Sequence, residues 1–162
     1  MEYCCGTFEV HITPDLFKEM CKAGIDIPAK TFHPIMQASE KRNELDLVLP
    51  IYKTLRNYDV KQIGETFKYM INSVVKMKFF EAAYNLLNEM TELDIQQTSQ
   101  LYNAIMAGYF RENSICRGLA VLKQMKNADV KPDIDTYSYL IYYATNEKVA
   151  VKFSKHFKYM RK

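Results

Sequence analysis

The chain repeats itself every 35 residues without an insertion or a deletion. One column of the repeat holds Asp129, Asp94, Asp59 and Gly24, and a β-branched residue follows each of them. Three further columns hold hydrophobic, aromatic and threonine residues: Met20, Leu55, Met90, Met125 and Met160; Phe32, Phe67, Tyr102 and Tyr137; Thr31, Thr66 and Thr136, with Leu101 as the exception. A fixed period of this length indicates stacked supersecondary units, so it constrains the fold more than any other feature of the sequence.

The clearest unit spans residues 99–133. Apolar residues at helical spacing predict one helix from Leu101 to Arg111 and a second from Ile115 to Lys126, with a polar turn between them. Pro132 then prevents the second helix from continuing. One helical hairpin of this size cannot bury its own apolar face, so it needs copies of itself on either side. The sequence therefore predicts an all-α chain of tandem antiparallel helix-turn-helix repeats.

The period divides the chain into six segments. They are an irregular stretch (1–12), the second helix of a partial repeat (13–28), three complete repeats (29–63, 64–98 and 99–133) and an incomplete repeat (134–162). Outside the clearest unit, the predicted helices are Thr13–Ala23, Phe32–Lys41, Leu45–Arg56, Thr66–Lys76, Phe80–Thr91, Thr136–Asn146 and Val149–Met160. Pro50 lies more than a turn into the predicted Leu45–Arg56 helix, which predicts a later start or a kink there.

Composition and motifs argue against several classes of function. The net charge of +3, from 22 basic and 19 acidic residues, is too small to demand an anionic partner and does not exclude one. The four cysteines and three histidines lack ligand spacing, so neither a metal site nor a disulfide framework is expected. No apolar run reaches the roughly 20 residues of a membrane span. No Gly-rich phosphate loop, deaminase zinc signature or carboxylate cluster is present, so we expect no enzyme, cofactor or small-molecule substrate.

The repeats resemble those of the pentatricopeptide-repeat (PPR) family, whose usual motif reads roughly V-V-T-Y-N-T-L-I, then A-L-x-L-F-x-x-M, then G-I-K-P-D. Here LYNAIM (101–106) and VKPD (130–133) match it closely, and LFKEM (16–20) and TYSYLI (136–141) match it well. The resemblance covers residues 13–162. The tetratricopeptide repeat has period 34 and a characteristic Trp, whereas this chain holds 35 and contains no Trp.

The resemblance implies a fold, a partner and a compartment. The fold is a right-handed α-solenoid whose first helices line the concave face. The partner is single-stranded RNA, with one base read per repeat by two or three side chains. The compartment is a mitochondrion or plastid of a plant-type cell, where the work is RNA processing, stability or translation. The N-terminal residues show no transit-peptide character, so the compartment follows from the resemblance alone.

The resemblance also assigns reading residues, at the fifth and last positions of each repeat. Asn103 with Asp133 is a pair that favours uracil in the family. The other repeats offer His33 with Ile63, Lys68 with Thr98, and Ser138 without a partner. The thirteenth position, which supports the RNA backbone in the family, carries Lys41, Lys76 and Arg111.

Three alternatives remain open at this point. The second position, usually Val or Ile in the family, holds Lys30, Glu65, Gln100 and Asp135, and two of these are acids that repel phosphate. A protein-interaction scaffold with a degenerate RNA code would show the same departures. The chain could also be a piece of a longer PPR protein, because its end repeats are incomplete. Equally, Asn103 and Asp133 could be a polar helix start and a turn residue, and the basic residues could complement helix C-termini.

Overall fold

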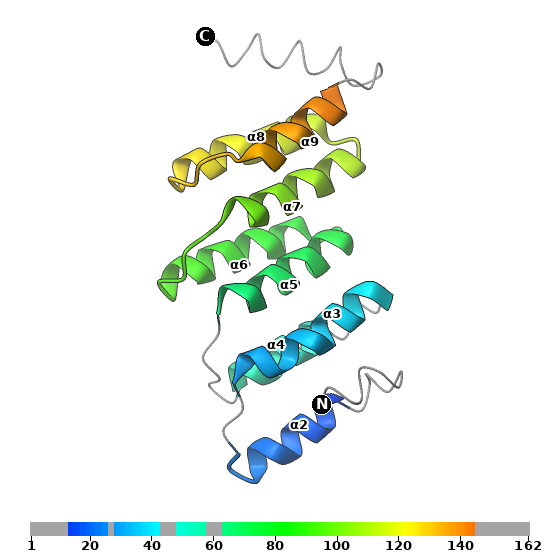
Figure 1. Ribbon diagram of the computed structural model, residues 1–162, viewed down its shortest axis with the longest axis vertical. Coiled ribbons are helices and arrows are strands. Elements are labelled where there is room, and N and C mark those ends of the chain that lie inside the picture. The colour runs from blue at the N-terminus through cyan, green and yellow to red at the C-terminus, as the bar shows by residue number, and fades with distance from the viewer. Residues whose placement is uncertain (1–12, 26–27, 43–47, 58–62, 145–162) are drawn as a thin grey trace. The chain divides into compact units, whose positions relative to one another are not determined.

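The computed structural model describes residues 13–25, 28–42, 48–57 and 63–144 (Figure 1). Throughout these ranges the only regular elements are helices, which confirms the all-α prediction. The chain divides into two compact units, residues 1–96 and residues 97–162, and each is described by itself. Within the described ranges no helix combines the length and apolarity needed to cross a bilayer.

Unit 1 consists of short helices. They are α2 (Thr13–Lys22), the 3₁₀-helix η2 (Ala29–Phe32), α3 (His33–Arg42), α4 (Val48–Asn57), α5 (Gly64–Lys76) and α6 (Phe80–Glu92). Helix α5 packs against α3, α4 and α6, and α2 packs against α4. The predicted start at Leu45 falls outside the described residues. As described, α4 begins at Val48, which puts Pro50 in its first turn, where a missing N–H is tolerated.

Unit 2 contains the best-matching repeat. Helix α7 (Ser99–Arg111) forms a hairpin with α8 (Ile115–Asn127) and also packs against α9 (Ile134–Ala144). The α7 and α8 bounds lie within two residues of those predicted from the apolar pattern. The predicted helix Val149–Met160 falls outside the described residues.

The Gly/Asp column of the repeat marks a shared way of ending helices. Gly24, Asp94 and Asp129 have φ angles of 72°, 54° and 56°, the left-handed conformation that closes a helix. The next residue then bonds back to the methionine column: Ile95 N–H donates to the Met90 carbonyl at 2.8 Å, and Val130 N–H to the Met125 carbonyl at 3.0 Å. These are Schellman motifs, so two columns of the period follow from helix termination.

The aromatic column forms the core in three of its four positions. Phe32 and Phe67 in unit 1 and Tyr102 in unit 2 are no more than 4% exposed. Tyr137, the fourth member, is instead 54% exposed on α9, and residues 145–162, which follow α9, fall outside the described part of the chain. The aromatic column is therefore buried at Phe32, Phe67 and Tyr102 and exposed at Tyr137.

Candidate nucleic-acid interface

The structure brings Asn103 and Asp133 together. Asn103 lies on α7 and Asp133 directly precedes α9, and the Asn103 Nδ2 donates to Asp133 Oδ1 at 3.0 Å. Asn103 is only 5% exposed, whereas Asp133 remains partly exposed. Two residues that are 30 positions apart thus form one polar pair at the junction of two consecutive first helices.

Asp133 also caps α9. Its Oδ1 accepts the Thr136 backbone N–H at 2.8 Å, and its own N–H donates to Thr136 Oγ1 at 3.1 Å. This reciprocal arrangement satisfies donors that a helix N-terminus would otherwise leave unpaired. The Ser99 hydroxyl donates to Asp133 Oδ2. The hydrogen bonds from Ser99 and the Thr136 backbone lower the pKa of the Asp133 carboxyl well below its usual range, so the group is ionised at neutral pH.

Thr136 completes the cluster, although the resemblance assigned it no role. Its hydroxyl is fully buried, with Oγ1 2.7 Å from Asn103 Oδ1 and 2.8 Å from Asp133 Oδ1. A threonine hydroxyl has one proton, so two acceptors compete for it. We call Ser99, Asn103, Asp133 and Thr136 the amide cluster. The threonine column of the sequence was the available sign of this role for Thr136.

His33 occupies the same place in unit 1 as Asn103 in unit 2. Its Nε2 lies 3.1 Å from Thr66 Oγ1, and its Nδ1 lies 3.1 Å from Glu65 Oε2. The ring is 8% exposed and its centroid is 5.5 Å from that of Tyr69. Both ring nitrogens are therefore engaged within the protein. Burial lowers the pKa of His33, and the Glu65 carboxylate partly offsets this effect.

The lowered pKa of His33 makes unit 1 sensitive to mild acid. The unfolded chain takes up this proton near pH 6.5, the ordinary value, while the folded state resists it. We expect the free energy of unfolding to fall as the pH is lowered from 7 through 6.5 toward the folded pKa. His33→Gln should remove this component in urea titrations at pH 7 and pH 5.5. An unchanged pH dependence in His33→Gln would show that His33 is not its source.

The remaining predicted reading residues are less engaged with one another. Lys68 is exposed on α5, and the Ser138 hydroxyl donates to the Ile134 carbonyl of its own helix at 2.8 Å. Ile63 and Thr98 directly precede α5 and α7, and neither makes a side-chain capping bond. Ile63 has no polar group to offer His33. Asn103 with Asp133 is the predicted pair that the structure joins by a hydrogen bond, and its role in reading a base stays a prediction.

The predicted backbone-binding residues lie at equivalent places in their helices. Lys41, Lys76 and Arg111 are exposed in the last turns of α3, α5 and α7. Lys76 Nζ lies 2.9 Å from Glu40 Oε1, so a phosphate would have to share or displace this partner. A cation at this end of a helix also complements the helix dipole.

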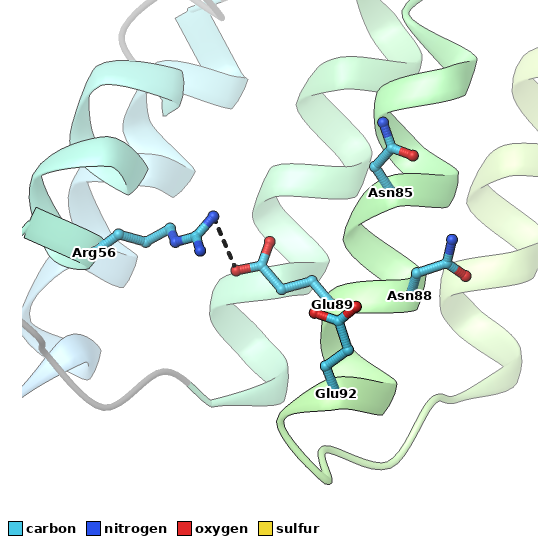
Figure 2. Close-up of a pocket in the computed structure, with 5 residues that line it drawn as sticks. All are labelled: Arg56, Asn85, Asn88, Glu89 and Glu92. Atoms are coloured by element: carbon cyan, nitrogen blue, oxygen red, sulfur yellow. Dashed lines mark ion pairs between the residues drawn. The ribbon is translucent and has the colours of Figure 1, made fainter.

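A polar hollow of about 310 Å³ lies elsewhere in unit 1, between α4 and α6 (Figure 2). Arg56 reaches from α4 to Glu89 on α6, with 3.5 Å between Nη1 and Oε1, and Asn85, Asn88 and Glu92 complete the lining. The hollow includes none of the predicted site residues. Across the described residues, no three His, Cys, Asp or Glu side chains are placed to hold a metal ion.

Two family models match the chain. A model of the PPR repeat family matches residues 97–143, and a PPR repeat model matches residues 65–95. A mitochondrial pentatricopeptide repeat-containing protein of Arabidopsis thaliana is 44% identical over 90 residues, which cover 56% of this chain and 11% of that protein. The mitochondrial 15S rRNA processing factor ppr3 of Schizosaccharomyces japonicus is 28% identical over 120 residues, covering 73% of this chain and 18% of that protein. The chain thus spans less than a fifth of the length of these two relatives.

Solved structures establish the fold. The maize pentatricopeptide repeat protein PPR10 aligns over 98% of this chain and 23% of its own, with a TM-score of 0.77 and 18% identity. The PPR domain of Arabidopsis thaliana protein-only RNase P 1, solved in complex with tRNA, aligns over 98% of this chain and 84% of that one, with a TM-score of 0.71 and 18% identity. The repeat period and the paired helices agree with both family models, and the chain carries pentatricopeptide repeats, matched at residues 65–95 and 97–143.

Proposed function

We propose that the chain is a non-catalytic module that binds single-stranded RNA from the first helices of its repeats, within a mitochondrion or plastid. There it would act in RNA processing, stability or translation. Relatives whose names place them in mitochondria or chloroplasts, and one named as an rRNA processing factor, support this. Two similar structures hold RNA, one a tRNA and one an 18-nt psaJ element. The observation that carries the proposal is the hydrogen-bonded pair of Asn103 and Asp133.

The chemistry of this pair suits a base edge. An asparagine amide offers both a donor and an acceptor, while the ionised Asp133 carboxylate accepts only. Uracil presents carbonyl acceptors on either side of its N3–H donor, so it complements such a mixed set. We propose that Asn103 with Asp133 reads uracil. In the other repeats, the residues proposed to read bases are His33 with Ile63, Lys68 with Thr98, and Ser138.

The basic residues would supply the part of the binding affinity that does not depend on the RNA sequence. Lys41, Lys76 and Arg111 stand exposed at the ends of three first helices. Each cation that neutralises a phosphate releases counterions, so binding weakens as salt is raised, with a logarithmic slope of about −0.7 per contact on single strands. The salt slope therefore reports how many of these residues touch the backbone.

Fluorescence anisotropy with labelled U-rich, C-rich and duplex RNA across a salt series tests the proposal. We expect binding to single strands that favours the U-rich oligomer and weakens with salt. Asn103→Ala should lower affinity for the U-rich oligomer about tenfold, because a reading contact is worth about 1–3 kcal/mol. Lys41→Gln with Lys76→Gln should reduce the salt slope by about 1.4, two contacts at 0.7 each. Glutamine is chosen because a glutamate at position 76 would repel Glu40.

A matched double variant controls for net charge. Lys53 on α4 and Lys123 on α8 are exposed lysines outside the predicted interface. Lys53→Gln with Lys123→Gln removes the same charge and should leave the salt slope nearly unchanged. Equal slopes for the two double variants would mean that Lys41 and Lys76 do not contact RNA. The proposal fails altogether if the folded chain, checked by circular dichroism, binds no single strand at low salt.

The alternative proposal is a protein-interaction scaffold on the same fold. One observation favours it: both nitrogens of His33 are bound by Glu65 and Thr66, so this repeat has little left for a base. The second-position residues Glu65 and Asp135 also present exposed acids. This alternative would be established by a folded chain that does not bind RNA at low salt and that co-purifies with one protein in a fixed ratio.

A further inference from the structure

The distances in the amide cluster locate its contacts on one side of the Asn103 amide. Asp133 Oδ1 lies 3.0 Å from Asn103 Nδ2, Thr136 Oγ1 lies 2.7 Å from Asn103 Oδ1, and these two partner oxygens are 2.8 Å apart. Partners on the two outer sides of an amide would be separated by much more than that. Both therefore sit on the edge where the amide oxygen and nitrogen face the same way. This is the edge through which an asparagine could form two hydrogen bonds with a base, and it is already paired within the protein.

The same contacts fix the polarity of the amide. A carboxylate can only accept, so the nitrogen of Asn103 must face Asp133 and the oxygen must face the Thr136 hydroxyl. Rotating the amide by half a turn would place its oxygen against the carboxylate, two acceptors together. Ser99 holds the other carboxylate oxygen and so keeps Asp133 in this orientation. These contacts leave the second N–H of Asn103 and the second lone pair of its oxygen unused.

We propose that Thr136 and Ser99 are positioning residues for base recognition: they lock the Asn103 amide in one orientation, so that a base meets an outward donor at a fixed place. This inference rests on the RNA-binding function proposed above. Uracil carries the O4 acceptor where cytosine carries the N4 amino donor, so an amide of fixed polarity distinguishes the two bases. An amide free to rotate presents either end and discriminates far less.

The repeat columns support a pairing of this kind elsewhere in the chain. Thr66 contacts His33, which lies 33 residues earlier, as Thr136 contacts Asn103. Both earlier residues offer an atom that can accept the hydroxyl proton. The column breaks once, at Leu101, and the residue 33 positions before it is Lys68, which has only donors. Thr66 and Thr136 thus follow repeats that offer an acceptor, and Leu101 follows a repeat that does not.

The test measures the ratio of affinities for U-rich and C-rich single strands, rather than affinity alone. Thr136→Val keeps the shape of the side chain and removes its hydroxyl, so we expect the U-over-C ratio to fall about fivefold, with less than a twofold change in binding to the C-rich strand. Thr136→Ser retains the hydroxyl and should restore the ratio. Ser99→Ala should lower it about twofold, because only the second carboxylate oxygen loses its donor.

Thr54→Val is the matched control. Thr54 is a buried threonine on α4 whose hydroxyl donates to the Pro50 carbonyl at 2.8 Å, so the same atoms are removed outside the amide cluster. Its ratio should equal that of the wild type. Thermal melts identify any variant that does not fold. If Thr136→Val does not fold, the U-over-C affinity ratio of Ser99→Ala tests the positioning role instead.

The outcomes separate the two proposals. A wild-type chain that binds RNA and prefers U, together with a folded Thr136→Val variant that keeps the full preference, overturns the positioning role and leaves RNA binding intact. A wild-type chain that does not bind single strands overturns RNA binding, and the positioning role falls with it. In the free protein, NMR should show Asn103 side-chain amide protons that exchange with solvent more slowly than those of an exposed asparagine, because Asp133 and Thr136 hold the amide, and Thr136→Val should speed up this exchange.

Discussion

Asp133→Ala will lower the free energy of unfolding of unit 2 by about 3 kcal/mol, as the sum of two losses. Removing an N-cap carboxylate costs about 0.5–2 kcal/mol, and leaving a buried polar partner unsatisfied costs about 1–3 kcal/mol more. The buried partner is the Asn103 amide, and the Thr136 N–H loses its cap. Urea denaturation of the full chain, followed by circular dichroism, measures the change.

Asp135→Ala is the matched control for charge. Asp135 is an exposed acid in the first turn of α9, two residues from Asp133, and its removal should cost only a few tenths of a kcal/mol through the helix dipole. Asp133→Asn separates charge from shape, because the amide keeps the volume and cannot accept from all the donors around it. Equal stabilities for Asp133→Ala and Asp135→Ala would show that the amide cluster contributes nothing to folding.

The Asp133 carboxylate also makes stability depend on acid. Its folded pKa lies below the ordinary value of 3.8, chiefly because Ser99 and the Thr136 backbone donate to it. Its contribution is therefore fully present above pH 4 and is lost as the pH falls through the folded pKa. Wild-type stability should decline below pH 4 more steeply than that of Asp133→Asn. His33 acts at higher pH, so the two windows are distinguishable.

Gly118→Ala will destabilise unit 2 by about 2 kcal/mol, although alanine is the better helix former. Helix propensity alone favours the substitution by about 1 kcal/mol. The new Cβ, however, would lie 2.3 Å from Cε1 and 2.6 Å from Cδ1 of Phe110, and overpacking of this severity costs about 3 kcal/mol. The Phe110 ring is 2% exposed, with its centroid 4.7 Å from that of Tyr143, so it has little room to withdraw.

Two further variants make this prediction sharp. Gly64→Ala at the start of α5 places a Cβ 3.8 Å from Ile95 Cγ2, an ordinary contact, and should be neutral or slightly stabilising. Phe110→Leu replaces the ring that would clash with the new Cβ of Gly118→Ala by a smaller side chain. The double variant should therefore be more stable than the sum of the two single effects predicts. A Gly118→Ala variant as stable as the wild type would mean that α7 and α8 separate without cost.

The sequence by itself determined the local structure of this protein. Helix bounds in the best repeat came within two residues, because apolar spacing and the residues that end helices act over one or two turns. The recurrence of Asp94 and Asp129 reflects a left-handed residue at a helix end, which is also a local property. The least certain boundary, around Pro50, is the one where local signals conflict.

Only the tertiary structure decided which contacts the candidate reading residues make within the protein. The sequence placed Asn103 and Asp133 in the family's reading columns, but it did not reveal that Ser99 and Thr136 close the cluster around them. It also could not show that Glu65 and Thr66 occupy both nitrogens of His33. In the amide cluster, three of the hydrogen-bonded pairs join residues that are 30 to 34 positions apart in the sequence. These pairs form because the consecutive first helices α7 and α9 pack side by side. A repeat period predicts that such neighbours meet, whereas the direction of each hydrogen bond depends on the packing of the individual side chains.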